Sequence, residues 1–223
     1  MKKCFGALVA LLLSFTALAV GQTPENQVPQ TRNQTSQADN QVPQAGNQEV
    51  AYAIATNIYL ANCQEAIAQR ASNMANTTKV GLDPIRQQCD QTGKLVDTIG
   101  TASAPQWSSQ ANNYRKVLAS FAFQPNGNHI STGTYRRALS VNRAVQDAIN
   151  STAISRTGAK SGESADTIRA LWDNANRCIT KVKAEQSKPD SGTMPDDTQL
   201  LNQLVSAAEQ LMMQLNAGPQ QQQ

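Results

Sequence analysis

The cysteines are the residues of this chain whose chemistry depends most on the compartment in which the protein resides. Cys4 falls in a hydrophobic N-terminal run that we expect to be removed, which leaves Cys63, Cys89 and Cys178. In an oxidising compartment two of these would pair and one would remain. We favour Cys63 with Cys89, because they flank one predicted interhelical turn, and closing that loop would stabilise the fold by about 3 kcal/mol in the chain-entropy model. The other two pairings stay open, as do three buried thiols with no disulfide.

A second group that could carry chemistry is a set of basic residues in the middle of the chain. Between Arg115 and Lys160 the only acidic residue is Asp147. Arg136 and Arg143 are seven residues apart and share one face of a predicted helix, with Arg137 beside them.

These arginines have two interpretations. They could form a contact surface for an anionic envelope polymer, for lipid headgroups or for a partner protein. They could instead be solvated, or pack beside the final segment, where every charge after Lys188 is acidic.

Patterns for catalysis and metal binding do not occur in the sequence. The one histidine, His129, lies in a predicted turn, and no G-x-S-x-G elbow accompanies it. There is no C-x-x-C pair and no Glu-x-x-His pair. Asp166 and Asp173 share a helix face with polar neighbours, which indicates solvated surface; a carboxylate enzyme such as a polysaccharide lyase or transglycosylase is the remaining catalytic alternative. We therefore predict no enzymatic activity, no metal and no cofactor.

The charge balance argues against nucleic acid as a partner. Charged residues make up 16% of the chain and aromatic residues 4%, and their place is taken by Gln, Asn, Ser and Thr. The formal net charge of +3 falls to about +1 if Lys2 and Lys3 are lost with the N-terminal run. A nucleic-acid binder would show a concentrated basic footprint instead.

Residues 1–21 have the pattern of a secretion signal peptide. Lys2 and Lys3 precede an apolar run over residues 5–19, and Ala17-Leu18-Ala19 or Ala19-Val20-Gly21 offers the small residues that signal peptidases accept. The run is shorter than the roughly 20 apolar residues of a membrane span. We expect a secreted or periplasmic protein with no transmembrane segment in the mature chain.

Composition divides the rest of the chain into a leader, a folded domain and a tail. Residues 22–48 form a Gln/Asn/Pro-rich linker in which the sequence of residues 26–30 recurs at 40–44. With so few apolar residues, the burial of apolar surface is too small to offset the conformational entropy that ordering would cost. We therefore expect this linker and the poly-Gln tail at 218–223 to be disordered. Residues 49–217 are long enough for one helical bundle domain.

Apolar residues spaced by three and four predict six helices in this domain. The first covers residues 48–74. The second opens with Asp83 as N-cap and Pro84 at the first helical position, and ends at Gly100. The third starts at the capping-box sequence 103–106. The others cover about 132–154, 163–186 and the residues after Asp196. The fold class is all-α, an antiparallel bundle of about five or six helices.

Two of these helices carry informative stripes. The first helix has one stripe of Ala51, Ile54 and Ile58, and a second of Leu60, Cys63, Ile67, Ala71 and Met74. Two stripes predict a central helix with several neighbours. The last helix repeats Leu201, Leu204, Ala208, Leu211 and Leu215 in a coiled-coil-like heptad. That heptad predicts core packing, or alternatively docking into the groove of another chain.

Together these features favour an exported, non-enzymatic helical protein that binds a protein or an envelope polymer in the cell envelope or outside the cell. One alternative is a carrier of a small apolar ligand between its helices. Another is a minor subunit of an envelope appendage or secretion apparatus. In size, signal and helicity the chain resembles small exported helical proteins of bacterial envelopes, including minor pilus subunits of conjugation machinery. No motif carries this resemblance, so it implies no residue roles.

Overall fold

The protein folds as a bundle of helices. The computed structural model describes residues 42–72, 79–125, 130–157, 162–186 and 195–217. Within these ranges there are six helices and no strand, which confirms the predicted all-α bundle. The helices are α1 (Val42–Ala71), α2 (Lys79–Ser103), α3 (Ser108–Phe123), α4 (Thr132–Arg156), α5 (Gly162–Gln186) and α6 (Pro195–Ala217). The predicted signal peptide, most of the predicted linker, His129 and the poly-Gln tail lie outside the described residues.

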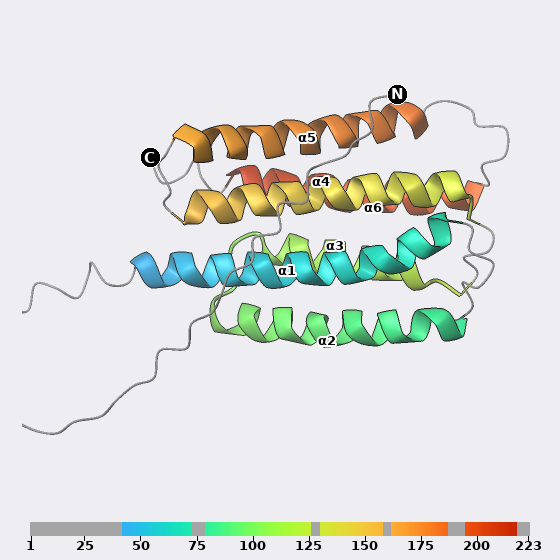
Figure 1. Cartoon of the computed structure of the whole chain (residues 1–223), viewed down its shortest axis with the longest axis horizontal. Helices are drawn as coiled ribbons and strands as arrows, with labels where there is room; N and C mark the ends of the chain where they lie inside the picture. Colours follow the sequence, from blue (N-terminus) through green and yellow to red (C-terminus); the bar gives the residue numbers. More distant parts are fainter. Residues whose placement is uncertain (1–41, 73–78, 126–129, 158–161, 187–194, 218–223) are drawn as a thin grey trace, which may run out of the picture.

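The helices form two layers (Figure 1). In the first layer α2, α1, α4 and α5 lie side by side in that order, so α1 and α4 are central and α2 and α5 are edge helices. In the second layer α3 and α6 pack against each other, with α3 also on α1 and α6 also on α4. The predicted central position of the first helix is confirmed, because α1 packs against α2, α3 and α4. In the described ranges no helix combines the length and the apolar character needed to cross a membrane.

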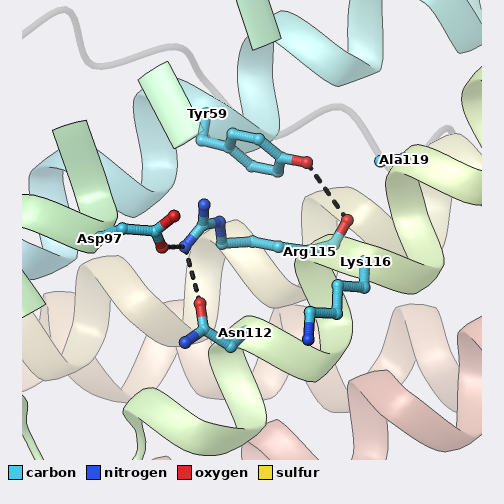
Figure 2. A pocket seen from close by; sticks show the side chains of 6 residues that line it. All are labelled: Tyr59, Asp97, Asn112, Arg115, Lys116 and Ala119. Carbon is cyan, nitrogen blue, oxygen red and sulfur yellow. Dashed lines mark hydrogen bonds and ion pairs between the residues drawn. The ribbon is translucent and has the colours of Figure 1, made fainter. Parts of the chain in front are cut away.

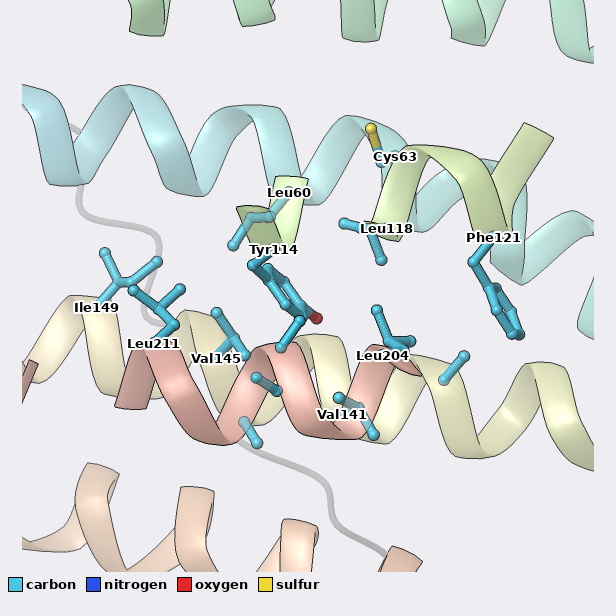
Figure 3. Packing of buried hydrophobic residues seen from close by; sticks show 14 of the residues in the cluster. Leu60, Cys63, Tyr114, Leu118, Phe121, Val141, Val145, Ile149, Leu204 and Leu211 are labelled. Carbon is cyan, nitrogen blue, oxygen red and sulfur yellow. The ribbon is translucent and has the colours of Figure 1, made fainter. Parts of the chain in front are cut away.

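The hydrophobic core lies between the two layers (Figure 3). Leu60 of α1, Val145 of α4 and Leu118 of α3 have no exposed surface. The apolar repeat of α6 is buried in the same core, and its members are Leu201, Leu204, Ala208, Leu211 and Leu215. The leucine stripe of α6 therefore packs inside this chain, against α3 and α4. Burial of this apolar surface is the main force that holds the layers together.

One polar side chain in the core has all of its hydrogen-bonding groups occupied. Asn142 of α4 is fully buried; it accepts a hydrogen bond from the Tyr114 hydroxyl at 3.2 Å. Its amide nitrogen donates to the carbonyl of Leu60 at 3.2 Å and to Oε1 of Gln64 at 3.0 Å. A buried amide is tolerated when it is satisfied in this way, and these bonds connect α1, α3 and α4.

Helix α1 begins six residues earlier than predicted, at Val42, so residues 42–48 are helical rather than part of the linker. Pro43 is compatible with this start, because the first turn of a helix leaves its N–H groups without intrahelical partners. The bundle anchors α1 directly after this extension. Glu49 forms an ion pair with Arg156 of α4 at 2.9 Å and accepts a hydrogen bond from the Trp107 indole at 2.9 Å.

The predicted ends of α2 were wrong at both sides. The helix starts at Lys79 and contains Pro84, because burial of Leu82 in the core favours an additional turn before the proline. It continues through Gly100, which lies against the ring of Tyr52, where an added Cβ would be 3.0 Å from Cε2. Gly100 thus permits close packing of α2 on α1 and does not end the helix.

The predicted capping box at 103–106 was also wrong, because Ser103 is the last residue of α2. The chain turns at Pro105, whose carbonyl accepts a hydrogen bond from the amide of Ser108 at 2.9 Å. Helix α3 then starts with Trp107 in the N-cap position and no side-chain cap.

Asp197, in the first turn of α6, connects α6 to the start of α4. It is buried, and its carboxylate accepts a hydrogen bond from the amide of Ser131 at 2.9 Å and from the Thr134 hydroxyl at 3.3 Å. Ser131 is the N-cap of α4, and its hydroxyl accepts from the amide of Thr134. The first turn of α6 therefore completes the cap of α4. The side chain of Asp196 lies outside the described residues.

Candidate functional site

The surface of the four-helix layer that faces away from α3 and α6 carries large exposed apolar side chains. The first apolar stripe predicted for α1, Ala51, Ile54 and Ile58, lies on this surface. Ile54 is 42% exposed and Ile58 is 45% exposed, although both belong to the central helix of the layer. We call these three residues the outer stripe.

Two hydrogen-bonded pairs flank the outer stripe and fix its position. Asn57 donates to Oδ1 of Asn150 on α4 at 2.7 Å, and Asn62 donates to the hydroxyl of Thr92 on α2 at 3.4 Å. Ile54 and Ile58 lie within a turn of Asn57 and Asn62 along α1. The outer stripe thus faces outward between α2 and α4.

Leu95 of α2 extends this apolar surface. It is 49% exposed. The Asn62–Thr92 hydrogen bond sets the register of the two antiparallel helices. One turn before Asn62 on α1 is Ile58, and about one turn after Thr92 on α2 is Leu95. The two side chains are therefore at the same level of the layer. We call Ile54, Ile58 and Leu95 the outer patch.

The structure separates the three arginines predicted to form an anionic contact surface. Arg136 is exposed on α4. Arg137 is turned toward α5; its side chain is 17% exposed and lies 3.7 Å from the carboxylate of Glu185. Arg143 is half-buried beside Asp147. Arg137 thus has an acidic partner on α5. An anionic contact surface at Arg136 and Arg143 stays a prediction.

Asp147 connects α4 to α5 beside Arg143. Its carboxylate accepts a hydrogen bond from the side-chain amide of Asn174, and Oδ1 of Asn174 accepts from Arg177 at 3.1 Å. Burial raises the pKa of Asp147 above its ordinary value of 3.8, while the hydrogen bond from Asn174 and the charge of Arg143 oppose that shift. Asp147 therefore stabilises the contact of α5 with α4 less when it is ionised.

A polar recess of about 430 Å³ lies between α1, α2 and α3, and Figure 2 shows the side chains around it. Arg115 is 7% exposed, and its guanidinium donates to Asp97 at 2.8 Å, to Asn112 at 2.7 Å and to the carbonyl of Gly93 at 3.0 Å. It also lies over the ring of Tyr59, 4.6 Å from the centroid. Arg115 is held by these contacts, and the charged side chains that line this recess make it unsuited to an apolar ligand.

The three cysteines of the expected mature chain are all buried thiols. Sγ of Cys63 on α1 and Sγ of Cys89 on α2 are 2.6 Å apart. Cys178 lies on α5, and α4 separates α5 from α1 (Figure 1). The structure therefore brings together the pair that we favoured, as thiols, and the disulfide stays a prediction.

The acidic residues considered for catalysis do not gather in a cleft. Asp166 and Asp173 are both exposed on α5. In the part of the chain that the structure describes, no three His, Cys, Asp or Glu side chains are grouped so that they could hold a metal ion.

Sequence reasoning singled out Ile54 and Ile58 only as a stripe for packing against other helices, which was wrong because both are exposed, and it missed Leu95. Leu95 directly precedes the buried Val96 and belongs to no apolar repeat along α2. Only the register of α2 on α1 reveals that Leu95 lies level with Ile58. The arrangement around Arg115 was missed as well, because its partners come from three separate helices.

Comparison of the chain with protein-family models, with curated proteins and with solved structures found no match.

Proposed function

We propose that this chain is exported and binds a partner protein in the cell envelope or outside the cell through the outer patch. The observation that carries the proposal is the exposure of Ile54 and Ile58 on a central helix of the layer. Contiguous exposed apolar side chains on a folded protein commonly mark interaction sites. Export is supported by the charged start, the apolar run and the small residues of positions 1–21.

The polar surroundings of the outer patch favour a protein over a membrane or an uncharged polymer as the partner. The hydrogen-bonded pairs Asn57–Asn150 and Asn62–Thr92 lie beside the apolar side chains, as in the polar rim of a protein interface. Arg136 and Arg143 lie on the neighbouring helix α4 and would favour carboxylates at the edge of the partner.

A crosslinking experiment with matched positions tests this proposal. A photo-crosslinking amino acid is placed at position 58, and at position 213 as a control, because Met213 is 63% exposed on α6 in the second layer. We expect a specific adduct with an envelope or extracellular protein from position 58 alone. Equal adducts from both positions, or none from position 58, would contradict the proposal.

The same partner then serves to measure affinity. Full burial of an isoleucine contributes about 1.5–3 kcal/mol, so Ile54→Gln with Ile58→Gln should weaken binding at least about tenfold. Met213→Gln removes a comparable exposed apolar side chain from α6 and should leave the affinity unchanged. Retention of full affinity by the double variant would rule out the outer patch as the binding site.

Export is tested separately by the mass and N-terminal sequence of the protein recovered outside the cytosol. We expect cleavage after Ala19 or Gly21. A chain that keeps residues 1–21 would contradict the proposed export, whatever the outcome of the binding experiments.

A further inference from the structure

The thiol pair of Cys63 and Cys89 joins the central helix α1 to the edge helix α2. Their Sγ atoms are 2.6 Å apart, and the two side chains are 0% and 1% exposed. Antiparallel contacts on both sides of the pair hold α2 in register, namely the Asn62–Thr92 hydrogen bond and the close approach of Gly100 to Tyr52. The two thiols are therefore already positioned for an intramolecular disulfide.

The folded structure protects the same thiols from oxidants. A disulfide donor in solution cannot reach side chains that are so completely buried. The hydrogen bond with Cys63 and the burial of the site raise the pKa of Cys89, so its reactive thiolate is scarce in the folded protein. Proximity alone therefore does not make this pair reactive.

Undocking of α2 would expose both thiols. Helix α2 is an edge helix whose apolar side chains pack mainly on α1. To α3 it is joined by polar contacts, namely the hydrogen bonds of Arg115 with Asp97 and Gly93 and of Arg86 with the carbonyl of Phe123, and undocking must break these bonds as well. Its buried apolar side chains are Leu82, Cys89 and Val96, and most of its remaining surface is exposed. An edge helix with few buried side chains can open without unfolding of the whole bundle.

We propose that Cys63 and Cys89 are oxidised to a disulfide while α2 is undocked, and that the disulfide then locks α2 onto α1. The co-reactant is a disulfide donor, either a small molecule or a thiol oxidase. The thiolate of one cysteine attacks the donor disulfide, which forms a mixed disulfide and releases one donor thiolate. The thiolate of the other cysteine attacks the cysteine sulfur of the mixed disulfide and displaces the second donor thiolate. Two cysteine protons end on the two donor thiols.

The position of Cys178 makes this pairing selective. Cys178 is buried on α5, at the opposite edge of the layer from α2. A disulfide from Cys178 to Cys63 would require α4 to leave its place, and because α5 packs on α4 rather than on α2, undocking of α2 leaves Cys178 buried. This inference does not depend on partner binding, and its test uses the purified chain alone.

Thiol counting during oxidation tests the proposal. The reduced full chain is incubated with oxidised glutathione, either in native buffer or in urea. The reaction is stopped with acid at several times. The remaining thiols are then alkylated in denaturant and counted by mass spectrometry. We expect oxidation to be at least about tenfold slower in native buffer than in urea, because it must wait for α2 to open. After oxidation, refolding and peptide mapping, we expect a Cys63–Cys89 disulfide with Cys178 alkylated.

The variant Cys178→Ser serves as a control, which should form the same disulfide at the same rate. The proposal is overturned if all three cysteines remain alkylatable after refolding with glutathione, or if the disulfide includes Cys178. Equal oxidation rates in native buffer and in urea would overturn the requirement for undocking.

Hydrogen exchange compares the oxidised and reduced forms of the same sequence and so avoids any variant that fails to fold. We expect amides of α2 to exchange at least about tenfold more slowly in the oxidised form, while amides of α5 stay unchanged. Equal exchange of α2 in both forms would show that the disulfide does not lock the helix.

Discussion

The two apolar stripes of α1 resemble each other in sequence but differ in environment. Leu60, Cys63 and Ile67 are completely buried inside the bundle, whereas Ile54 and Ile58 are 42% and 45% exposed on the other side of the same helix. The difference comes from the number of helices available. Helices α3 and α6 cover one side of the four-helix layer, and no further described helix covers the other side. An apolar stripe thus indicates a surface suited to burial without identifying the chain that buries it.

The largest expected difference between the two stripes is in stability. Leu60→Ala removes a fully buried side chain and should lower the free energy of unfolding by about 2–5 kcal/mol. Ile58→Ala on the outer stripe should change it by less than about 1 kcal/mol, because nearly half of its surface is already in water. Urea denaturation of both variants measures these changes. Similar losses in the two variants would mean that the outer stripe is buried within the chain.

A buried and an exposed asparagine of α4 allow the same comparison, with a smaller expected effect on stability. Asn142→Ala should lower the free energy of unfolding by about 1–3 kcal/mol, because it leaves the buried Tyr114 hydroxyl without its partner and removes the side-chain hydrogen bond to the Leu60 carbonyl. Asn150→Ala on the outer side of α4 is the control and should cost at most about 0.5 kcal/mol. Equal losses of unfolding free energy in the two variants would show that the burial of Asn142 does not determine its contribution.

The double variant Ile54→Gln with Ile58→Gln sharpens the comparison further. It should fold with the same helical circular dichroism as the parent chain and change the free energy of unfolding by less than about 1 kcal/mol. Glutamine favours helices more than isoleucine does, which offsets part of the lost contact. A loss above about 2 kcal/mol would show that these side chains serve stability rather than partner binding.

The smallest expected effect concerns Asp147, at the seam of α4 and α5. Burial raises the pKa of Asp147 in the folded chain above its ordinary 3.8, so the folded chain binds the proton more tightly than the unfolded chain does. The stabilisation that protonated Asp147 provides is therefore fully present below the pKa of the unfolded chain, and it is lost as pH rises through the raised pKa of the folded chain. In Asp147→Asn that loss is absent, so the Tm of the variant relative to the parent should increase from about pH 4 to pH 7.

Thermal melts at constant ionic strength measure this dependence on pH. Asp173→Asn is the matched control, because Asp173 is exposed on α5, and its Tm difference should stay constant over the same range. A constant Tm difference for Asp147→Asn would mean that Asp147 titrates with its ordinary pKa.

The fold could be predicted from the sequence because its helices follow apolar periodicity. The stripe of α6 was predicted correctly, since it is buried by neighbours in the same chain. Helix ends were predicted less well, because local signals at Pro84, Gly100 and Ser103 were overridden by packing of α2 on α1. Tertiary burial of Leu82 and the close approach of Tyr52 are not visible in a local window of sequence.

The candidate site could be predicted only in part. Spacing along one helix identified Ile54 and Ile58 as a stripe, and the interhelical turn suggested the pairing of Cys63 with Cys89. The exposure of the stripe, and the position of Leu95 beside it, depend on the order of helices in the layer, which periodicity does not encode. The same is true of Arg137, whose contact with Glu185 on α5 connects residues far apart in the chain.

The hydrogen bonds from Ser131 and Thr134 to Asp197 have a consequence for how the protein is made. Helix α6, which follows α4 by about 40 residues in the chain, supplies the carboxylate that finishes the start of α4. Protein that still lacks residues 195–217 would therefore have an α4 without this carboxylate at its first turn, and the side of α4 that α6 covers would be in water. The core between the two layers can thus be completed only after α6 has been made.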